Sequence, residues 1–274
     1  MDNSNIAERM KQYESTSHIS LLRKTPVIIR IDGKAFHTFT KDMEKPFSYE
    51  LSQCMQETAK YLVQNIQGCK LAYVQSDEIS LLLTDYETIY TDCWFGYTLQ
   101  KLVSISASMA TMAFNKQWLD FELNYRDDCL SGDQKSSKIN IIEYAMFDSR
   151  AFNLPQEEVC NYFIWRQQDA TRNSIQMVGQ SHFSHKELQN KNCNQIQDML
   201  MLNKNINWND TPTIYKRGFC VYKRKIMTNF NFTGTSITNS GIEMDGNGIM
   251  KTEIVIDKEI PIFTQDRDFI EQWI

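Results

Sequence analysis

The stretch VIIRIDGKAFHTF, residues 27–39, ends an apolar run on an aspartate and follows it with glycine, lysine and histidine. Its first six residues predict a β-strand, whose side chains alternate between two faces. Val27, Ile29 and Ile31 then share one apolar face, while the other face becomes polar toward its end, at Asp32. A buried strand that finishes on a carboxylate indicates a functional site at that edge of a sheet.

The segments that follow predict a helix, a hairpin, a second helix and a strand. Residues 47–66 place apolar side chains on one helical face, with Ser48 as N-cap. Residues 70–85 form two short apolar segments around the polar sequence QSDE, which predicts a hairpin with a charged tip. A long helix over residues 94–118 precedes a strand within residues 140–155. The order β-α-β-β-α-β is that of ferredoxin-like α+β folds.

The remaining residues predict a helical and β extension. Residues 156–203 follow a helical pattern, interrupted by a capping box in the sequence SHKE at 184–187. Residues 216–226 and 248–257 predict strands joined by a polar loop. We therefore expect an α+β chain with a catalytic core at residues 1–155 and an extension at residues 156–274.

Composition limits the classes of protein to consider. With 42% hydrophobic residues among 274, the chain has enough apolar material for a globular core. The polar, acidic N-terminus and the lack of a long apolar stretch predict no secretory signal and no membrane span, so we expect a cytoplasmic protein, or one in an organelle. The seven cysteines are widely spaced without a CxxC pair, which argues against a zinc knuckle or a disulfide framework. A net charge of −5 means that a nucleic-acid partner must be held by local basic patches.

Carboxylates of the QSDE turn can meet the end of the first strand. If the hairpin adjoins that strand, Asp77 and Glu78 lie about 5 Å from Asp32. Two carboxylates this close repel by about 3 kcal/mol at an effective dielectric near 20, so a cation should lie between them. A pair of Mg²⁺ ions suits oxygen ligands on two adjacent strands. The other interpretation is an ordinary turn at Asp32 and an ordinary hairpin tip at Asp77.

A series of motifs resembles, in order and spacing, the tRNA-His guanylyltransferase superfamily of 3′–5′ nucleotide-adding polymerases. The likeness covers about residues 5–225, and an ordered series is more specific than any single motif. The segments that carry it are RIDGKAFHTF (30–39), KP (45–46), AYVQSDEISLLL (72–83), KLVSISAS (101–108), FDSRAF (147–152) and YFIWRQQDATRNS (162–174).

The resemblance implies a palm-like fold and a set of site residues. Asp32, the Gly33 carbonyl and Asp77 would bind two Mg²⁺ ions, and Glu78 joins the two aspartates as a catalytic residue. ATP, GTP or other nucleoside triphosphates would be substrates. Taken alone, however, His37 and Ser76 also fit an ordinary loop histidine and turn serine, and Lys101 a solvated helix lysine. The positions that match the family's nucleotide-binding residues are Gly33, Lys34, Ala35, Phe36, His37, Lys45, Ser76 and Lys101.

One departure from the family pattern bears on the substrate. Members that add guanosine to tRNA-His carry His-Ile-Asn-Asn where this chain has TRNS, residues 171–174. The sequence thus looks more like the bacterial-type and archaeal-type branch, and we expect template-directed repair of truncated tRNA 5′ ends. The alternatives are guanosine addition to tRNA-His, a palm-type nucleotide cyclase, and a non-catalytic RNA-binding protein.

Basic residues near the second half of the chain are candidate RNA contacts. The sequence YKRGFCVYKRKI, residues 215–226, interleaves lysine and arginine with aromatic rings, which suits a nucleic-acid backbone. A solvated edge strand protected by lysines is the alternative. The resemblance further implies a homotetramer, a dimer of dimers, with tRNA as partner. The candidate RNA-binding residues are Arg166, Asn173, Lys216, Arg217, Lys223 and Arg224.

Overall fold

A seven-stranded antiparallel sheet with the order β4-β1-β3-β2-β5-β7-β6 organises the computed structural model, which describes residues 5–131, 144–228, 243–245 and 248–274. This mixture of antiparallel strands and helices confirms the α+β class. The strands are β1 (Val27–Gly33), β2 (Cys69–Gln75), β3 (Glu78–Leu83), β4 (Phe147–Asn153), β5 (Phe219–Thr228), β6 (Glu243–Asp245) and β7 (Gly248–Asp257).

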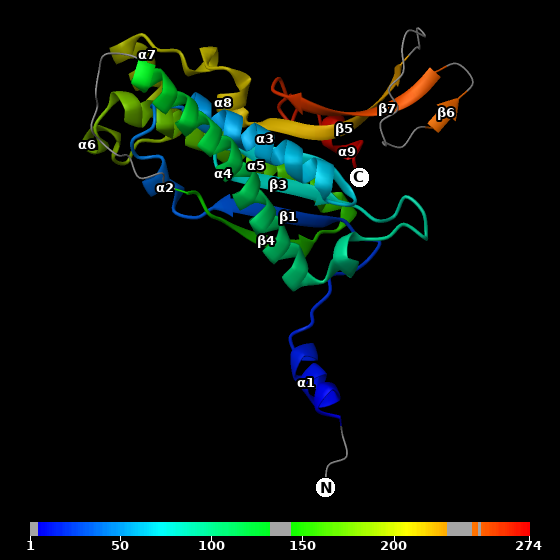
Figure 1. Cartoon of the computed structure of the whole chain (residues 1–274). Helices are drawn as coiled ribbons and strands as arrows, with labels where there is room; N and C mark the ends of the chain where they lie inside the picture. Colours follow the sequence, from blue (N-terminus) through cyan, green and yellow to red (C-terminus); the bar gives the residue numbers. More distant parts are fainter. Residues whose placement is uncertain (1–4, 132–143, 229–242, 246–247) are drawn as a thin grey trace.

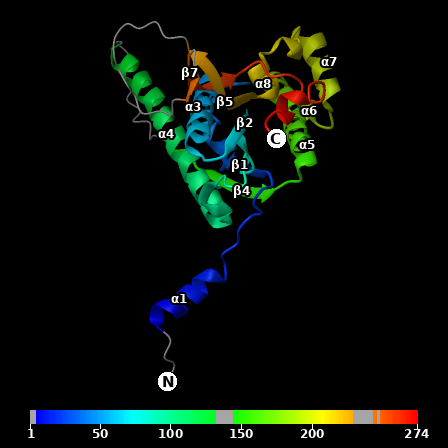
Figure 2. The same cartoon turned by 90° about the vertical axis from the view of Figure 1, so that its right-hand side faces the viewer.

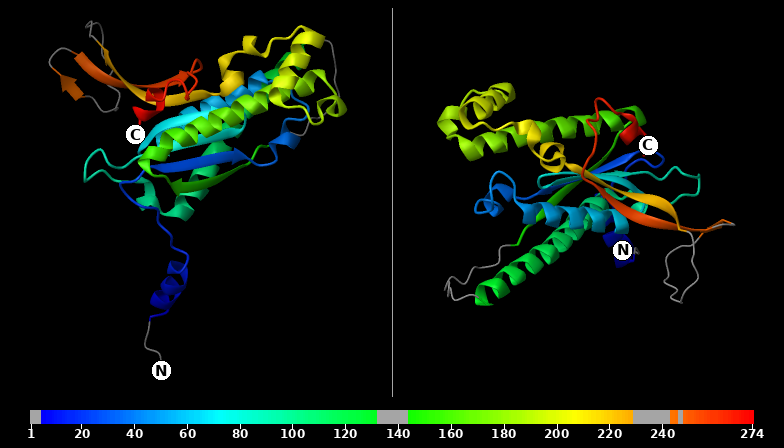
Figure 3. Two further views of the ribbon diagram at one scale, coloured as in Figure 1. Left: turned by 180° about the vertical axis from the view of Figure 1, so that it is seen from behind. Right: turned by 90° about the horizontal axis from the view of Figure 1, so that it is seen from above.

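Helices cover both faces of the sheet. Figure 2 shows α3 and α4 on one side of the strands and α5 on the other, and Figure 3 shows α5 along the sheet from behind and from above. The helices are α1 (Ile6–Ser15), α2 (Phe36–Phe39), α3 (Tyr49–Asn65), α4 (Leu99–Ser131), α5 (Gln156–His182), α6 (His185–Leu188), α7 (Cys193–Lys204), α8 (Thr213–Arg217) and α9 (Asp268–Glu271), with short 3₁₀ helices η1 (Trp94–Tyr97) and η2 (Trp208–Asp210).

Alternation along β1 gives the predicted core face, and the start of the opposite face enters a second hydrophobic core that the sequence analysis did not predict. Val27, Ile29 and Ile31 are fully buried in the core beneath α3 and α4. Ile28 points the other way and packs in a second core that α5 covers. Asp32 therefore lies on the α5 face of the sheet, because side chains two residues apart share a face.

Local signals placed most helix ends correctly. The Ser48 hydroxyl caps α3 by accepting a hydrogen bond from the Leu51 amide at 3.1 Å, and residues 184–187 form the expected capping box. The long helix differs from the prediction. It begins at Leu99, because Phe95 and Gly96 have left-handed backbone angles, with φ of 50° and 61°. It continues to Ser131, and no glycine or proline interrupts the sequence after residue 118.

The C-terminal extension continues the sheet of the core. Its first strand, β5, pairs with β2, and Val74 lies opposite Phe219. Gly218 permits this approach, because its φ is +83° and a Cβ there would lie 2.2 Å from the Val74 carbonyl oxygen. Strand β7 then pairs with β5, while part of the predicted polar loop between them falls outside the described residues.

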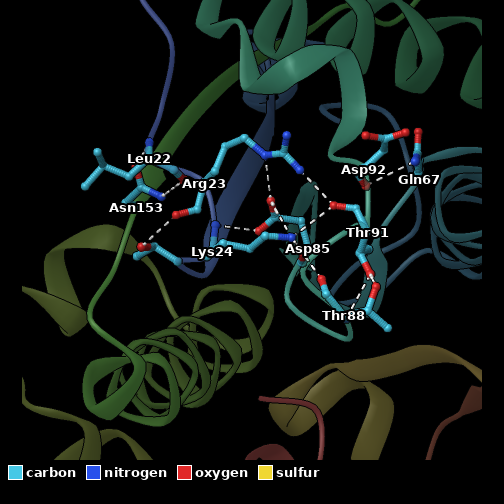
Figure 4. Close-up of polar contacts among 10 residues, drawn as sticks. Leu22, Arg23, Lys24, Gln67, Asp85, Thr88, Thr91, Asp92 and Asn153 are labelled. Atoms are coloured by element: carbon cyan, nitrogen blue, oxygen red, sulfur yellow. Dashed lines mark hydrogen bonds and ion pairs between the residues drawn. The ribbon is translucent and has the colours of Figure 1, made fainter.

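An N-terminal arm leads into the far end of the sheet. Helix α1 has no buried residue and points away from the rest of the chain (Figure 1). Asp85, which is fully buried just after β3, binds this arm. Its carboxylate accepts hydrogen bonds from Arg23 Nε at 3.0 Å and from the Lys24 amide at 2.7 Å (Figure 4). Lys24 Nζ also donates to the carbonyls of Asp85, Thr88 and Thr91. None of the helices in the described ranges is long and apolar enough to cross a membrane.

Candidate active site

The end of β1 and the turn between β2 and β3 meet at one edge of the sheet. The Gly33 amide donates a hydrogen bond to the Asp77 carbonyl oxygen at 3.1 Å. In the strand register, Asp32 lies opposite Glu78 on β3 and opposite Asp148 on β4. The acidic residues at the strand end and in the hairpin tip are therefore neighbours, as the sequence analysis expected.

Burial and mutual repulsion raise the pKa values of both aspartates. Desolvation is the main cause at Asp77, whose pKa lies at about 6 instead of 3.8, with repulsion from Asp32 and Glu78 adding to it. Burial also raises the pKa of Asp32, followed by repulsion from Glu78 and Asp148. No ion pair within the described part of the chain involves the side chain of Asp32 or Asp77. The edge is thus acidic, and its arginines, Arg166 and Arg150, form their ion pairs with Glu78 and Asp148 instead of with the two aspartates.

Glu78 is held by an arginine from α5. Arg166 donates from Nε to Oε1 at 2.7 Å and from Nη2 to Oε2 at 2.6 Å, a bidentate pair. The two residues are only 6% and 8% exposed, and Arg166 also contacts Asp169 at 3.1 Å. Arg166 was a candidate RNA contact in the sequence analysis, and the structure instead buries it beside Glu78. Strand alternation explains it, since Glu78 points to the face that α5 covers. Glu78 thus supports the site and is not a free carboxylate.

A cleft beside the aspartates gathers most of the expected nucleotide-binding residues. Its volume is about 280 Å³. Gly33 lies close to it, with the Phe36 ring so near that a Cβ on the glycine would be 2.2 Å away. Lys34 and Ala35 are exposed in the same loop but do not line the cleft. The predicted residues in its wall are Phe36, His37, Lys45, Ser76 and Asp77.

Backbone geometry in the two loops of the cleft is unusual. Ala35 and Ser76 have φ values of 56° and 48°, in the left-handed region that residues with a Cβ seldom occupy. Such positions cost of order 1–3 kcal/mol and are held by the surrounding fold, often at functional sites. The Lys34 amide bonds to the Met146 carbonyl at 2.8 Å, and Lys45 Nζ donates to the Thr40 carbonyl at 2.8 Å. These contacts fix the loop between β1 and α3 beside the hairpin turn.

Lys101 lies at the other end of the sheet, away from the cleft of the same chain, and its role in nucleotide binding stays a prediction. It is in the first turn of α4, where its ammonium lies 5.7 Å from the centre of the Phe95 ring. The part of α4 next to the cleft is at Phe114, whose ring contacts Phe36. Thirteen residues of helix separate Lys101 from Phe114, about 20 Å along the axis. The family resemblance pointed to Lys101 by its motif, but it did not show at which end of the sheet α4 begins.

The remaining RNA candidates lie on α5, α8 and β5. Lys216 donates to the Asn209 carbonyl at 2.6 Å, and Arg224 pairs with Glu253 of β7 at 3.3 Å. Lys223 and Arg217 are partly exposed. Asn173 is exposed on α5 and lines a second cavity next to the cleft. Their roles as RNA contacts stay predictions.

Two further residues of this edge were missed by the sequence analysis. Asp148 was part of a quoted motif, yet only the register of β4 places it opposite Asp32. It is exposed and pairs with Arg150 at 3.2 Å. Asp169 lies on α5 as the second partner of Arg166. Its spacing of three residues from Arg166 is a signal that could have been used.

The donor atoms at this edge fit a hard divalent cation. Asp32 and Asp77 supply carboxylate oxygens, and the Gly33 carbonyl belongs to the same strand end. In the regions that the structure describes, no group of three or more His, Cys, Asp and Glu side chains could hold a metal. Mg²⁺ is usually bound by one or two carboxylates, with the rest of its shell from water and phosphate. The pair of aspartates could thus hold Mg²⁺ only together with a nucleotide or water.

An acidic sheet edge beside a cleft carrying lysine, histidine and serine is the type of site that transfers nucleotidyl groups. Comparison with known families agrees with this class. Residues 7–155 match the sequence model of Thg1, tRNAHis guanylyltransferase, which is more than half of the chain. The chain belongs to this family of nucleotidyltransferases.

Individual relatives extend the likeness beyond the matched core. A tRNA(His) guanylyltransferase of Schizosaccharomyces pombe is 30% identical over 224 residues, 77% of this chain and 77% of that protein. The structure is similar to a bacterial tRNA(His) guanylyltransferase (Thg1)-like protein in complex with ATP, with a TM-score of 0.79, 44% identity and 98% coverage of both chains. A second structure of this description, in complex with GTP, gives a TM-score of 0.74 and 41% identity over 98% of this chain and 99% of that one.

Proposed function

We propose that this protein repairs truncated tRNA by adding nucleotides to the 5′ end in the 3′–5′ direction. The observation that carries the proposal is the meeting of Asp32 and Asp77 beside a cleft that contains His37, Lys45 and Ser76. This gives one acidic place for cations and one polar place for phosphates. The resemblance to bacterial proteins bound to ATP and GTP supports nucleoside triphosphates as the substrates.

The reaction has an activation step and an addition step. The 5′-monophosphate of the RNA attacks the α-phosphorus of ATP, pyrophosphate leaves, and the RNA end becomes adenylylated. The 3′-hydroxyl of an incoming nucleoside triphosphate then attacks the 5′-phosphorus of that end, a phosphodiester forms, and AMP leaves. An RNA that already ends in a triphosphate releases pyrophosphate instead. Both steps are in-line phosphoryl transfers, in which positioning and charge stabilisation supply most of the rate.

The protein's own residues divide this work. Asp32 and Asp77, with the Gly33 carbonyl, would hold two Mg²⁺ ions, which lower the pKa of the attacking hydroxyl and neutralise charge on the leaving group when bound. Lys45 and His37 line the cleft where they can contact a triphosphate. Arg166 keeps Glu78 in place behind the turn that carries Asp77. No side chain needs to act as a dedicated general base.

Repair is preferred to guanosine addition for two reasons. The similarity to the bacterial Thg1-like protein, 44% identity over 98% of this chain, exceeds that to the fission yeast enzyme, 30% over 77%. The sequence Thr171-Arg172-Asn173-Ser174 also departs from the His-Ile-Asn-Asn pattern. Guanosine addition to tRNA-His is the second candidate, because the matching family is described by that activity.

The fold and assembly complete the proposal. The strand order β4-β1-β3-β2 with helices between β1 and β2 and between β3 and β4 supports a ferredoxin-like, palm-type core. We assign this core to residues 1–155 and the RNA-binding extension to residues 156–274. By family resemblance we also expect a homotetramer acting on tRNA in the cytoplasm. Sedimentation of the purified protein, with and without tRNA, tests the assembly.

One experiment tests repair against its alternatives. The purified protein receives a 5′-monophosphorylated tRNA lacking its first nucleotide, with ATP, Mg²⁺ and each nucleoside triphosphate in turn, and full-length tRNA-His in parallel. Repair requires incorporation of only the nucleotide that pairs across the acceptor stem. Guanosine added regardless of pairing would identify the tRNA-His activity. Nucleotide consumed without RNA would indicate a cyclase, and no reaction by a protein that still binds tRNA would leave an RNA-binding role.

A further inference from the structure

A large cavity lies at the end of the sheet opposite the active site, and we call it the far-end cavity. Its volume is about 700 Å³, within the range of about 300–1,000 Å³ that is typical of small-molecule sites. It is lined by Cys69 at the start of β2, whereas the cleft lies past the other end of that strand at Ser76, about 20 Å away. Figure 1 shows the loop after β3 and the C-terminal segment at this end of the sheet, and α2 at the opposite end.

The far-end cavity forms where β5 continues beyond its pairing with β2. The last residue pair between the two strands is Tyr222 opposite Leu71, while β5 continues to Thr228 with β7 as its partner on the other side. Lys223, the first residue of β5 past this pairing, lines the cavity. The space is therefore a wedge between the outer part of β5 and the beginning of β2.

Two polar atoms of the cavity wall are buried without a hydrogen-bond partner. They are the hydroxyl oxygen of Tyr86, just after β3, and the indole nitrogen Nε1 of Trp273 in the C-terminal segment. In the parts of the chain that the structure describes, only Nε of Arg30 shares this state. Because native proteins seldom leave buried polar groups unpaired, two of three such atoms in one cavity indicate a ligand that pairs with them there.

The groups that need a partner are donors. An indole N–H can only donate a hydrogen bond. Burial, followed by the charge of Asp85, raises the pKa of Tyr86, so its hydroxyl keeps its proton at neutral pH and can donate as well. Lys223 adds a cation that forms no ion pair within the described residues. Burial raises the pKa of the Cys69 thiol in the same wall, and the charge of Lys223 opposes that rise. The expected ligand therefore carries negatively charged acceptor atoms.

The acidic side chains of the wall do not supply such an acceptor. Glu87 forms an ion pair with Lys70, so its charge is already balanced. Asp92 is exposed, and its main-chain carbonyl accepts a hydrogen bond from Gln67 Nε2 at 3.1 Å (Figure 4). These contacts hold the wall of the cavity together and leave the donors of Tyr86 and Trp273 unpaired.

We propose that the far-end cavity binds a phosphate-bearing ligand of nucleotide size, with a phosphate at Tyr86, Trp273 and Lys223. A phosphate offers several acceptor oxygens at once and forms strong charge-assisted hydrogen bonds. The ring of Trp273 is held against Tyr222, with centroids 4.8 Å apart, and aromatic rings beside lysines are typical of surfaces that bind nucleotides. The phosphate can belong to a free nucleotide or to an RNA strand. The proposal does not depend on nucleotide addition at the other end of the sheet.

The test measures binding at equilibrium by isothermal titration calorimetry, with EDTA present so that no Mg²⁺ bridges a nucleotide to the acidic edge. Tyr86→Phe removes one hydroxyl and Trp273→Phe removes one indole N–H, and both keep an aromatic ring. The matched control is Tyr90→Phe, which removes a hydroxyl from a tyrosine that is 89% exposed and does not line the cavity. The probes are ATP, inorganic triphosphate and a short single-stranded RNA with a 5′-hydroxyl. Thermal melting verifies that each variant folds, and Tyr86→Phe decides the test if Trp273→Phe does not.

If the ligand is a free nucleotide, ATP binds the wild type, and Tyr86→Phe and Trp273→Phe each weaken ATP and inorganic triphosphate about tenfold. If the phosphate belongs to RNA, only the RNA binds the wild type, and the same two variants weaken it. In both cases Tyr90→Phe binds as the wild type does. The proposal is overturned if no probe binds the wild type, which would assign the unpaired donors to water. It is also overturned if the folded cavity variants bind every probe as tightly as Tyr90→Phe.

Discussion

The Gly33 amide and the Asp77 carbonyl are joined by a hydrogen bond of 3.1 Å, and this bond ties the last residue of β1 to the turn between β2 and β3. Two segments more than forty residues apart in sequence thereby bring Asp32 and Asp77 to one edge. Because the bond uses main-chain atoms, side-chain changes at either aspartate should leave the geometry intact. Substitutions there can therefore test chemistry separately from folding.

Replacing Asp77 with asparagine should stabilise the metal-free protein at neutral pH. Its carboxyl has a folded pKa of about 6, above the ordinary 3.8, so its stabilising contribution is complete below pH 4 and is lost as the pH rises through 6. The difference corresponds to about 3 kcal/mol in the free energy of unfolding. Urea unfolding from pH 4 to pH 8 should show this decline in the wild type and a smaller one in Asp77→Asn, because Asp32 also has a raised pKa. An identical profile for both proteins would disprove the assignment.

Magnesium should reverse that loss of stability. A ligand that binds only the folded state at 100 times its dissociation constant stabilises it by about 2.7 kcal/mol. We expect Mg²⁺ with a nucleoside triphosphate to raise the melting temperature of the wild type above pH 6, and EDTA to abolish the rise. Asp32→Asn and Asp77→Asn should each lose it, along with at least a hundredfold of nucleotide addition. Asp148→Asn is the control, and a metal effect that persists in Asp32→Asn would count against this site.

Removing the Arg166 guanidinium should destabilise the fold. Arg166→Gln leaves Glu78 buried without its bidentate partner, and breaking such a pair costs about 3–5 kcal/mol. Arg172→Gln on the same helix, an exposed residue that also contacts Asp169, should cost under about 1 kcal/mol. Chemical denaturation of both variants provides the comparison. If a Glu78→Gln, Arg166→Gln double variant recovers part of the free energy of unfolding that Arg166→Gln loses, the unpaired charge of Glu78 is the cause. Equal losses of stability in Arg166→Gln and Arg172→Gln would contradict this explanation.

Lys45 should act on nucleotide binding rather than on turnover. Its ammonium lines the cleft and bonds only to the Thr40 carbonyl among described groups, so it is free to contact a phosphate. Lys45→Ala should raise the KM for nucleoside triphosphate about tenfold, roughly 1.4 kcal/mol, with a smaller effect on kcat. Lys41→Ala, an exposed lysine beside Asp42 outside the cleft, is the matched control. Equal effects of the two substitutions would remove Lys45 from the site.

Basic residues on β5 should set the salt dependence of tRNA binding. If Lys223 and Arg224 contact phosphates, alanine at either position should reduce the slope of log affinity against log salt by about 1. Lys101→Ala tests that lysine in the same assay, because its distance from the cleft of its own chain predicts no change in slope or in nucleotide KM unless a neighbouring subunit of the proposed tetramer brings it to a site. Filter binding over a range of salt concentrations gives all three slopes. Unchanged slopes for both β5 variants would assign these residues to the alternative, a solvated strand.

The parts of the fold that were predictable are those governed by neighbouring residues. Period-two alternation predicted β1 and its two faces. Ser48, which accepts a hydrogen bond from the Leu51 amide, predicted the start of α3. The polar QSDE turn predicted the hairpin of β2 and β3. The end of α4 was missed, because its C-terminal half contains no strong stop signal and helix propensity alone does not locate an end.

In the candidate site, the sequence alone indicated which groups to consider for the chemistry, because Asp32, Asp77 and the loop before α3 belong to short motifs with local geometry. Only the tertiary structure decided their partners. The pairing of Glu78 with Arg166 joins residues 88 positions apart, and thirteen residues of α4 separate Lys101 from Phe114 beside the cleft. The physical reason is that strand register and helix direction are properties of packed layers, and they determine which side chains meet.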